Sequence, residues 1–456
     1  MKRNCDFLRI FAVLFVTIAV LLIAPVTTYA EESMQVRVGL RRSLANRETI
    51  ILTNTNILVG YGDNGAFRQT GQLHAAGGFT VRNLSNGIVL TSAGQTLHTF
   101  PTGQPAWITA TDGNFITMAG YSFRGVVEFS PAAGRLNIVN VLDMEEYLLG
   151  VLPSEMSPSF HAEALKAQAV AARTYTFNQM LRGTHSATNF DICDTTCCQV
   201  YRGAGTENAN ASAAVWATTG LMLFYNDMPI LASYFSSSGG ATENSEDVWW
   251  EALPYLRSVN EIVEHNPMVW ERTFTWAQLT TAAANQNAGI GQVTGVSISR
   301  LAPSGRVMNL TFHGASGDWT ALREVTIRNF FSPIGGTLPS RNFSIVGAEH
   351  TTPQVSTTNG HNDFEAPLNT MQAVNSRGAV STVHMGYIYD GTTTRRIDST
   401  ATRASGGNGI TIRGSGWGHG VGMSQMGAEG MARAGFTFDE ILHHYYTGVE
   451  LRTHGQ

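Results

Sequence analysis

The sequence has few charged residues and no excess of positive charge. Charged side chains make up 14% of the 456 residues, compared with about 25% in an average soluble protein. The formal net charge is −5, so the chain is poorly suited to binding a polyanion, and nucleic acid is not an expected partner. Hydrophobic residues make up 43% of the chain, which is enough to bury a core and excludes global disorder. The length predicts two to three domains, or one large domain with insertions.

Long apolar runs are absent from the sequence except for one close to the N-terminus. Basic residues in Lys2–Arg9 precede an apolar run, Ile10–Ala24, and Thr28–Ala30 resembles a cleavage site. The run is shorter than the roughly 20 residues that a membrane-spanning helix requires. Residues 1–30 are therefore predicted to be a signal peptide or, if they are not cleaved, an N-terminal membrane anchor. Either way the rest of the chain is expected to be exported and extracytoplasmic, and to reach the membrane only through an uncleaved N-terminal helix.

Cysteine is scarce, and three of the four cysteines lie close together. Cys5 precedes the apolar run, so Cys193, Cys197 and Cys198 remain in the exported part. An odd number of cysteines cannot form a complete disulfide framework. With His185 eight residues before Cys193, the three thiolates could hold one tetrahedral zinc ion. A Cys193–Cys198 disulfide, a reduced cluster and a catalytic thiol with a histidine partner are alternatives that the spacing leaves open.

The composition predicts strands in the N-terminal part of the chain. Residues 31–124 are rich in Thr, Gly, Asn and Val, and alternating stretches such as Gln35–Leu40 and Ile51–Val59 indicate short strands. Strands are expected to continue through Phe123–Val141. Later strands are expected at Leu221–Phe224, Pro229–Phe235, Gly295–Arg300 and Arg306–Phe312.

Helix signals appear in the middle of the chain. Ser157 and Pro158 predict an N-cap and a first turn, and the Ala-rich helix that follows runs to Leu181 before Gly183 ends it. A second helix is expected at Asn208–Thr219.

The C-terminal half contains a compositional outlier and a helix signal. Residues 350–409 are full of Thr, Ser, Asn and Gly and predict a partly ordered surface insertion, with one strand-like run at Ser381–Tyr389. Thr437–Glu440 matches a capping box, which predicts a short helix that Gly448 ends.

Glu155 is a carboxylate that the local sequence restrains. It lies between Pro153 and Pro158, which predicts a short, stiff connection just before the Ala-rich helix. A carboxylate held there has a fixed position, as a catalytic acid requires, although most glutamates are simply solvated.

A glycine-rich run near the C-terminus carries one histidine. If Gly414–Met423 is extended, the period of two places glycines on one side and Ser415, Trp417, His419 and Val421 on the other. A face of bare backbone could meet a packed helix or a sugar ring. Close packing with His419 as a buried core residue explains the pattern at least as well.

Four segments, in the same order, resemble the signature of the stage II sporulation protein D family. They are Tyr147–Met156, Glu163–Tyr175, Ser236–Trp249 and Gly416–Gln425. The resemblance covers roughly residues 125–451, apart from the insertion after about residue 350. The family includes lytic transglycosylases associated with sporulation and related amidase-enhancer proteins.

The resemblance implies an α+β fold: a β-rich catalytic domain with a long Ala-rich helix after the catalytic Glu loop. The domain would span 125–349 and 410–456, with the strand-rich region 31–124 before it and the insertion 350–409 between its parts. The implied reaction is cleavage of peptidoglycan between N-acetylmuramic acid and N-acetylglucosamine to give 1,6-anhydro ends, in cell-wall remodelling during sporulation (engulfment). Glu155 stands at the position of the catalytic glutamate.

One carboxyl group can carry out such a reaction, whereas ordinary glycosidases need two. Protonated Glu155 would donate to the glycosidic oxygen and then, as a carboxylate, accept a proton from the muramoyl C6 hydroxyl. The acid must be protonated near neutral pH, so its pKa must be raised by burial or a nearby negative charge. A helix opening at Pro158 would oppose this by about 0.3 to 1 kcal/mol, less than burial can supply. We therefore expect Glu155 to line an apolar or partly closed groove.

The other site residues are also implied by the resemblance. The residues expected to border the glycan groove are Arg173, Gln199, Ser237, His419 and Gln425. The cysteine segment matches one that binds zinc in some relatives through two Cys and two His, but here Cys197 stands where a His is usual and His185 lies further upstream. The expected cofactor is a structural zinc ion held by His185, Cys193, Cys197 and Cys198, and no organic cofactor is expected.

Two other functions compete with glycan cleavage by Glu155. A non-enzymatic amidase enhancer would bind an N-acetylmuramoyl-L-alanine amidase or the cell wall without cutting it. A thiol hydrolase would use Cys198 or Cys197 with a histidine, would be inactivated by alkylation and would tolerate Glu155→Gln. The expected partners are therefore peptidoglycan glycan strands and a cell-wall amidase.

Overall fold

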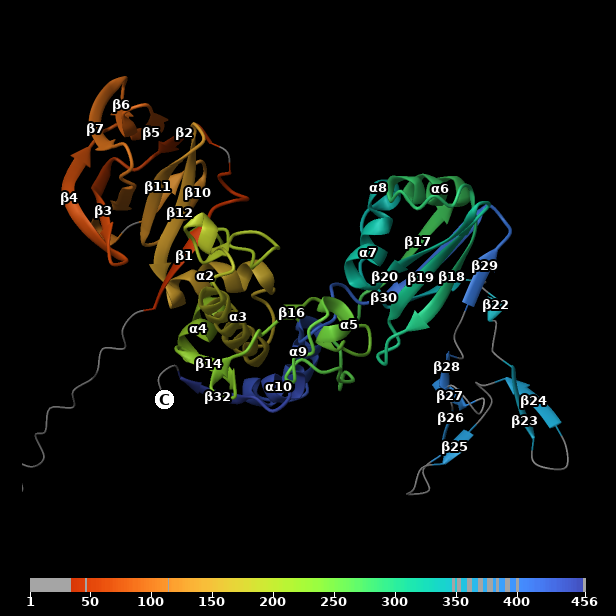
Figure 1. Ribbon diagram of the computed structural model, residues 1–456. Coiled ribbons are helices and arrows are strands. Elements are labelled where there is room, and N and C mark those ends of the chain that lie inside the picture. The colour runs from red at the N-terminus through yellow and green to blue at the C-terminus, as the bar shows by residue number, and fades with distance from the viewer. Residues whose placement is uncertain are drawn as a thin grey trace, which may run out of the picture. The chain divides into compact units, whose positions relative to one another are not determined.

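The computed structural model describes residues 34–453, except 46, 114, 347–348 and the segments that join short strands between 351 and 401 (Figure 1). The predicted signal peptide or anchor at residues 1–30 lies outside the described residues, as do large parts of the predicted insertion at 350–409. The described residues from Val36 onward belong to one compact unit. No helix in the described part of the chain is both long and apolar enough to cross a membrane.

The N-terminal strands form two sheets. The strands are β1 (Gln35–Gly39), β2 (Thr49–Leu52), β3 (Asn56–Asp63), β4 (Ala66–His74), β5 (Phe79–Leu84), β6 (Gly87–Ser92), β7 (Gln95–Pro101), β8 (Ala106–Ala110), β9 (Ile116–Met118), β10 (Tyr121–Phe123), β11 (Val126–Ala132), β12 (Arg135–Asp143) and, later in the chain, β13 (Ile192–Cys193). One sheet has the order β13-β1-β12-β11-β8-β3-β4 and the other β10-β9-β2-β5-β6-β7. The sheets contact each other where β11 meets β6 and β12 meets β5. Strands from both sides of residue 124 share one sheet, because β11 and β12 pair into the sheet that also contains β1, β3, β4 and β8.

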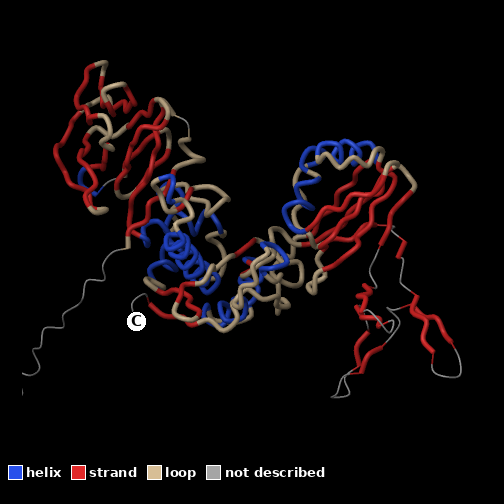
Figure 2. The backbone as a smooth tube through the Cα atoms, viewed as in Figure 1, coloured by secondary structure: helices blue, strands red, loops and turns tan. Residues whose placement is uncertain are grey.

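The helices that follow pack against one another and carry the Ala-rich segment. They are α2 (Met144–Glu155), α3 (Ala162–Arg182) and α4 (Ala209–Ala217), with 3-10 turns at Thr111–Gly113, Ser186–Thr188 and Ala204–Thr206. α2, α3 and α4 contact each other and are drawn in blue in Figure 2. The predicted helix at Asn208–Thr219 is confirmed as α4, with Asn208 as its N-cap. Gly183, at a φ of 59°, ends α3 as predicted.

The predicted start of the Ala-rich helix is wrong, and so is the predicted loop around Glu155. α3 begins at Ala162 with His161 as its N-cap. Pro153 lies inside α2, which continues to Glu155. Burial of the preceding turns of α2 outweighs the helix-breaking effect of proline, and Ser154 Oγ donates to the Gly150 carbonyl at 2.8 Å. Glu155 therefore ends a helix rather than lying in a loop between two prolines.

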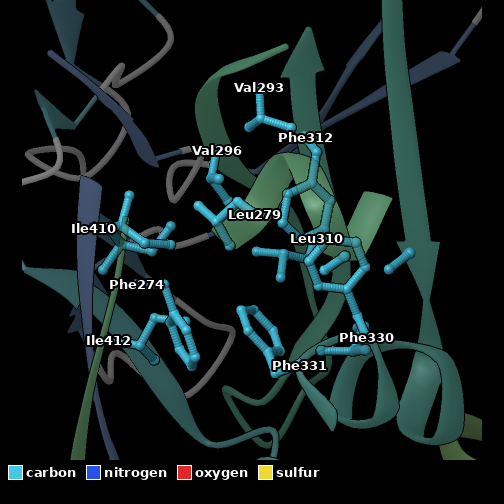
Figure 3. Close-up of a cluster of buried hydrophobic side chains, with 14 of the residues drawn as sticks. Phe274, Leu279, Val293, Val296, Leu310, Phe312, Phe330, Phe331, Ile410 and Ile412 are labelled. Carbon is cyan, nitrogen blue, oxygen red and sulfur yellow. The ribbon is translucent and has the colours of Figure 1, made fainter. Parts of the chain in front are cut away.

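A second sheet region surrounds an aromatic core. Its elements are β17 (Val269–Thr275), α6 (Trp276–Asn285), β18 (Val293–Leu301), β19 (Val307–Gly314), β20 (Gly317–Leu322), α7 (Arg323–Phe330), α8 (Ser332–Gly335), β21 (Phe343–Val346), β22 (Glu349–His350), β29 (Thr402–Ser405) and β30 (Gly409–Ser415). One sheet has the order β20-β19-β18-β29-β22 and the other β17-β30-β21. Phe312 of β19 stacks on Phe330 of α7, with ring centroids 3.9 Å apart, inside the cluster shown in Figure 3. The strands predicted at Gly295–Arg300 and Arg306–Phe312 are confirmed as β18 and β19.

Short hairpins occupy part of the predicted insertion. β23 (Gln354–Thr358) pairs with β24 (Asp363–Pro367), β25 (Gln372–Val374) with β26 (Val380–Thr382), and β27 (Met385–Tyr389) with β28 (Thr394–Asp398). β29 and β30 lie at the end of the predicted insertion and pair with strands of the second sheet region.

The remaining elements link the middle of the chain to its C-terminal part. They are β14 (Leu221–Tyr225), β15 (Met228–Pro229), β16 (Tyr234–Phe235), α5 (Ser245–Trp249), β31 (Met423–Ser424), α9 (Gln425–Arg433), α10 (Phe438–Tyr445) and β32 (Glu450–Thr453). β14 pairs with β32, and β16 pairs with β31. The predicted capping box is confirmed, because Thr437 and Glu440 cap each other's backbone at the start of α10. Strand-rich sheets with separate helices are compatible with the predicted α+β class.

The glycine-rich run is not extended throughout, so the condition for an alternation of glycine and side-chain faces is not met. Gly416, Gly418, Gly420 and Gly422 have φ values of 80°, 110°, 91° and 78°, which side chains with a Cβ rarely adopt. The chain therefore follows an irregular path between β30 and β31. A Cβ on Gly422 would lie 2.0 Å from the Ser233 carbonyl oxygen, so close packing does explain this glycine.

Candidate active site

Glu155 is held by segments that are distant in sequence. It is the last residue of α2, whose first turn is capped by Asp143. Its Oε1 accepts a hydrogen bond from the Val200 N–H at 2.5 Å. Its backbone carbonyl accepts from Gln425 Nε2, at the start of α9, at 3.0 Å. Both the side chain and the backbone of the acid are thus fixed from outside the helix.

Gln199 positions the N–H that contacts Glu155. Its Oε1 accepts from the Tyr147 hydroxyl at 3.2 Å and from Thr176 Oγ1 at 2.7 Å. Its Nε2 donates to the Ala172 carbonyl at 3.2 Å. Gln199 is fully buried, so it ties the segment that carries Val200 to α2 and α3.

The surroundings of Glu155 favour its neutral form. Burial raises the pKa of Glu155, while the Val200 N–H and the positive charge of Arg202 act in the opposite direction. The C-terminal end of a helix carries partial negative charge, so α2 also favours a protonated carboxyl group. The end of α2 therefore acts on the pKa of Glu155 in the opposite direction to a helix that starts at Pro158.

Glu155 lines a cavity of about 480 Å³, as expected for a partly closed groove. The lining residues come from α2, α3, the cysteine segment, the region around β16, α5 and the glycine-rich run. They are Glu155, Tyr175, Gln179, Thr196, Cys197, Cys198, Val200, Leu231, Ser233, Tyr234, Phe235, Ser236, Trp249, Gly418 and His419. Among these described lining residues, Glu155 is the only acidic side chain.

His419 is a packed, neutral wall of this cavity. Its Nδ1 accepts a hydrogen bond from the Val421 N–H at 3.0 Å. Its ring lies 5.5 Å from that of Phe235 and 5.1 Å from that of Trp249, measured between centroids. Burial lowers the pKa of His419 to about 4, so the ring is uncharged at neutral pH.

Three of the residues predicted to border the groove are fully buried away from it. Arg173 donates through Nε and Nη2 to the two carboxylate oxygens of Glu145, at 2.8 and 2.6 Å. Ser237 Oγ donates to Glu264 Oε1 at 2.7 Å, and Gln199 makes the contacts given above. Gln425 contacts the backbone of Glu155 and is only 8% exposed. Of the five, only His419 lines the cavity.

The structure brings the four predicted metal ligands together. The ligand atoms of His185, Cys193, Cys197 and Cys198 all lie within 4.8 Å of one another. His185 Nε2 is 3.0 Å from Cys198 Sγ, and the sulfurs of Cys193 and Cys198 are 3.4 Å apart. All three cysteines are free thiols. Thiolates about 2.3 Å from a tetrahedral zinc ion lie about 3.8 Å apart, so this group can hold a metal ion.

The N-terminal sheet anchors the cysteine segment. β13, which contains Cys193, pairs in parallel with β1. Asp194 is fully buried and accepts from the backbone N–H groups of Arg42 and Ser43 at 2.7 and 3.0 Å. The hydrogen bond between Cys193 and Cys198 lowers the pKa of Cys193 to about 5 and raises the pKa of Cys198, so Cys193 is the thiolate of this pair. Because Cys197 and Cys198 also line the cavity, the metal-ligand group lies beside Glu155.

Comparisons with known proteins place the chain in a family. The family model for stage II sporulation protein matches residues 132–225. Stage II sporulation protein D of Bacillus subtilis is 30% identical over 327 residues, which cover 69% of this chain and 75% of that protein. The chain belongs to the stage II sporulation protein D family.

Two other relatives match this chain at a similar level of identity. An uncharacterized protein of Brachyspira hyodysenteriae is 30% identical over 338 residues, covering 74% of this chain and 73% of that protein. The amidase enhancer of Bacillus subtilis is 31% identical over 310 residues, covering 67% of this chain and 40% of that protein. The stretch that the stage II sporulation protein model matches contains Glu155, all four predicted metal ligands and Val200.

Sequence reasoning missed several groups at this stage II sporulation protein D site. Tyr175 and Trp249 line the cavity and belong to segments that carry the family resemblance, so their motif positions could have suggested them. Val200 contributes a backbone N–H, which no residue type signals. Arg202 is exposed, and its influence on Glu155 is visible only in three dimensions.

Proposed function

We propose that this protein is a peptidoglycan lytic transglycosylase that acts in cell-wall remodelling during sporulation. It would cleave the bond between N-acetylmuramic acid and N-acetylglucosamine and leave 1,6-anhydro ends. One observation carries the proposal: a half-buried carboxyl group with a raised pKa lines a cavity that holds no second acidic side chain among its described lining residues. Hydrolytic glycosidases with paired carboxylates do not fit this arrangement.

The geometry suits a single group that acts first as acid and then as base. Because Glu155 Oε1 accepts from the Val200 N–H, the proton is carried by Oε2. Oε2 donates this proton to the glycosidic oxygen as the bond from that oxygen to C1 of the muramoyl sugar breaks. The resulting carboxylate accepts the proton of the C6 hydroxyl while the C6 oxygen forms a bond to C1 of the same muramoyl sugar. Glu155 is then protonated again, and no water is consumed.

We propose a structural zinc ion for the His185, Cys193, Cys197 and Cys198 group. Three thiolates and one imidazole form a complete tetrahedral ligand set, as in structural rather than catalytic zinc sites. Bound zinc would supply no chemistry to the reaction and would hold the segment that leads to Val200. With the thiols committed to a metal, a thiol hydrolase is disfavoured.

Two further proposals concern location and partners. The basic and apolar pattern of residues 1–30 supports export, so the protein would act outside the cytoplasm on glycan strands, in contact with the cell wall or the membrane. The relative named amidase enhancer supports a cell-wall amidase as a partner. It also makes non-enzymatic enhancement of an amidase the second candidate function.

The decisive experiment is to incubate glycan strands with wild-type protein and with Glu155→Gln, and to quantify 1,6-anhydromuramoyl ends by mass spectrometry. Loss of the acid is expected to slow their formation by about 10² to 10⁴-fold. Glu146→Gln is a matched control on the same helix, because burial also raises the pKa of Glu146 but it does not line the cavity.

Formation of anhydro ends by Glu155→Gln at the wild-type rate would refute the proposed mechanism. If wild-type protein makes no such ends but accelerates a cell-wall amidase, the enhancer function is correct instead.

A further inference from the structure

Two exposed tryptophans are sequence neighbours of residues that line the Glu155 cavity. Trp250 is 71% exposed and directly follows Trp249, which lines the cavity. Trp417 is 46% exposed and directly precedes Gly418, which also lines it. We call Trp250 and Trp417 the tryptophan rim.

Trp250 is held in place although its indole is open to solvent. Its backbone has a φ of 76°, in a region that costs energy for residues other than glycine. The guanidinium carbon of Arg323 lies 3.3 Å from the centre of the indole, and Arg323 itself donates to the Glu246 carbonyl. Arg323 also has a positive φ, of 62°. The backbone conformations of Trp250 and Arg323 thus hold the Trp250 indole against the Arg323 guanidinium. Most of the rest of the indole surface is exposed to solvent.

Trp417 is fixed through its backbone. Its N–H donates to the Ser237 carbonyl at 2.7 Å, and its carbonyl accepts from the Ser237 N–H at 3.1 Å. Ser237 is in turn held by Glu264. Both neighbours of Trp417, Gly416 and Gly418, have positive φ values. The backbone of Trp417 is therefore fixed by the glycine-rich run, while its side chain stays partly exposed.

We infer that the tryptophan rim binds sugar rings of the glycan strand on the parts that extend beyond the cavity. The face of a pyranose ring that carries axial C–H groups packs well on an indole, and an indole backed by Arg323 offers one flat ring-sized surface. A strand whose cleaved bond lies at Glu155 extends beyond the lining on both sides of that bond, and Trp250 and Trp417 are next in sequence to lining residues. This inference rests on the proposed function only in that the cavity receives a glycan strand.

Binding by the tryptophan rim can be measured without catalysis. In the Glu155→Gln protein, Trp250→Ala and Trp417→Ala are each expected to weaken binding of soluble, peptide-free glycan strands on the order of fivefold to tenfold. Trp250→Phe should restore part of the loss. The matched control is Trp216→Ala, because Trp216 is 52% exposed on α4 and does not adjoin a lining residue. It should bind as the parent does.

The inference is overturned if Trp250→Ala and Trp417→Ala bind glycan as tightly as the parent, or if Trp216→Ala loses as much affinity. Unchanged glycan binding with lost stimulation of an amidase would assign the rim to a protein partner and would also overturn it. If binding depends on the rim but wild-type protein forms no anhydro ends, the inference stands and the proposed reaction fails.

Discussion

The protonation of Glu155 is a balance between groups of opposite effect. Burial and the end of α2 favour the neutral acid, and the Val200 N–H and Arg202 favour the carboxylate. The proposed reaction needs the neutral form at the start of each cycle. Activity should therefore decline as the pH rises through the raised pKa of Glu155.

Arg202→Gln tests this balance. Removing the positive charge should raise the pKa of Glu155 further, so the protonated acid persists to higher pH. The decline of anhydro-end formation on the alkaline side is expected to move up by a few tenths of a pH unit, as suits an exposed charge. A pH–rate profile measures the shift, with Arg182→Gln as a control at an exposed pair with Glu251. A shift to lower pH would contradict the assignment.

Two helix termini that local chemistry fixes could be predicted, whereas the end of α2 and the start of α3 could not. Gly183 and the Thr437 capping box act within one turn, so their sequence signals were sufficient. The extension of α2 through Pro153 depends on burial of its preceding turns, which the sequence does not display. The candidate site divides in the same way: motifs indicate Glu155 and the candidate metal ligands, while the Val200 N–H depends on how a distant segment folds.

The cysteine segment should carry metal and support Glu155. After dialysis the protein is expected to retain about one zinc ion per chain by elemental analysis. Cys193→Ser should lose the ion and slow anhydro-end formation by about 10 to 100-fold, because the segment that leads to Val200 is released. Thr196→Ala, in the same segment but without a ligand atom, should retain zinc. Absence of metal together with a Cys193–Cys198 disulfide by mass spectrometry would contradict the zinc proposal.

A buried charge network joins the cavity to the second sheet region. Arg341 Nη2 lies 2.7 Å from Glu243, and its Nε lies 2.8 Å from Glu324 on α7. The Glu243 N–H donates to the Gly420 carbonyl at 2.7 Å, so the network also restrains the run that carries His419. Glu243 and Arg341 are fully buried.

Breaking this network should destabilise the fold as a whole. Arg341→Met leaves Glu243 without its closest cation and is expected to lower the free energy of unfolding by about 3 to 5 kcal/mol. Urea denaturation measures the loss. Glu271→Gln, at the exposed pair with Arg413, should cost less than about 1 kcal/mol. Equal losses of unfolding free energy in the two variants would show that the buried network contributes no more to stability than the exposed pair.

The hydrogen bond between Gln425 and the Glu155 carbonyl joins residues that are 270 positions apart in the chain. β14 likewise pairs with β32, which is made much later. A growing polypeptide therefore contains Glu155 long before it contains Gln425, which holds the backbone of Glu155. Under the proposed function, ribosome-bound or prematurely truncated copies would be inactive. An enzyme that cleaves the cell wall would then gain activity only after its C-terminal part has been made.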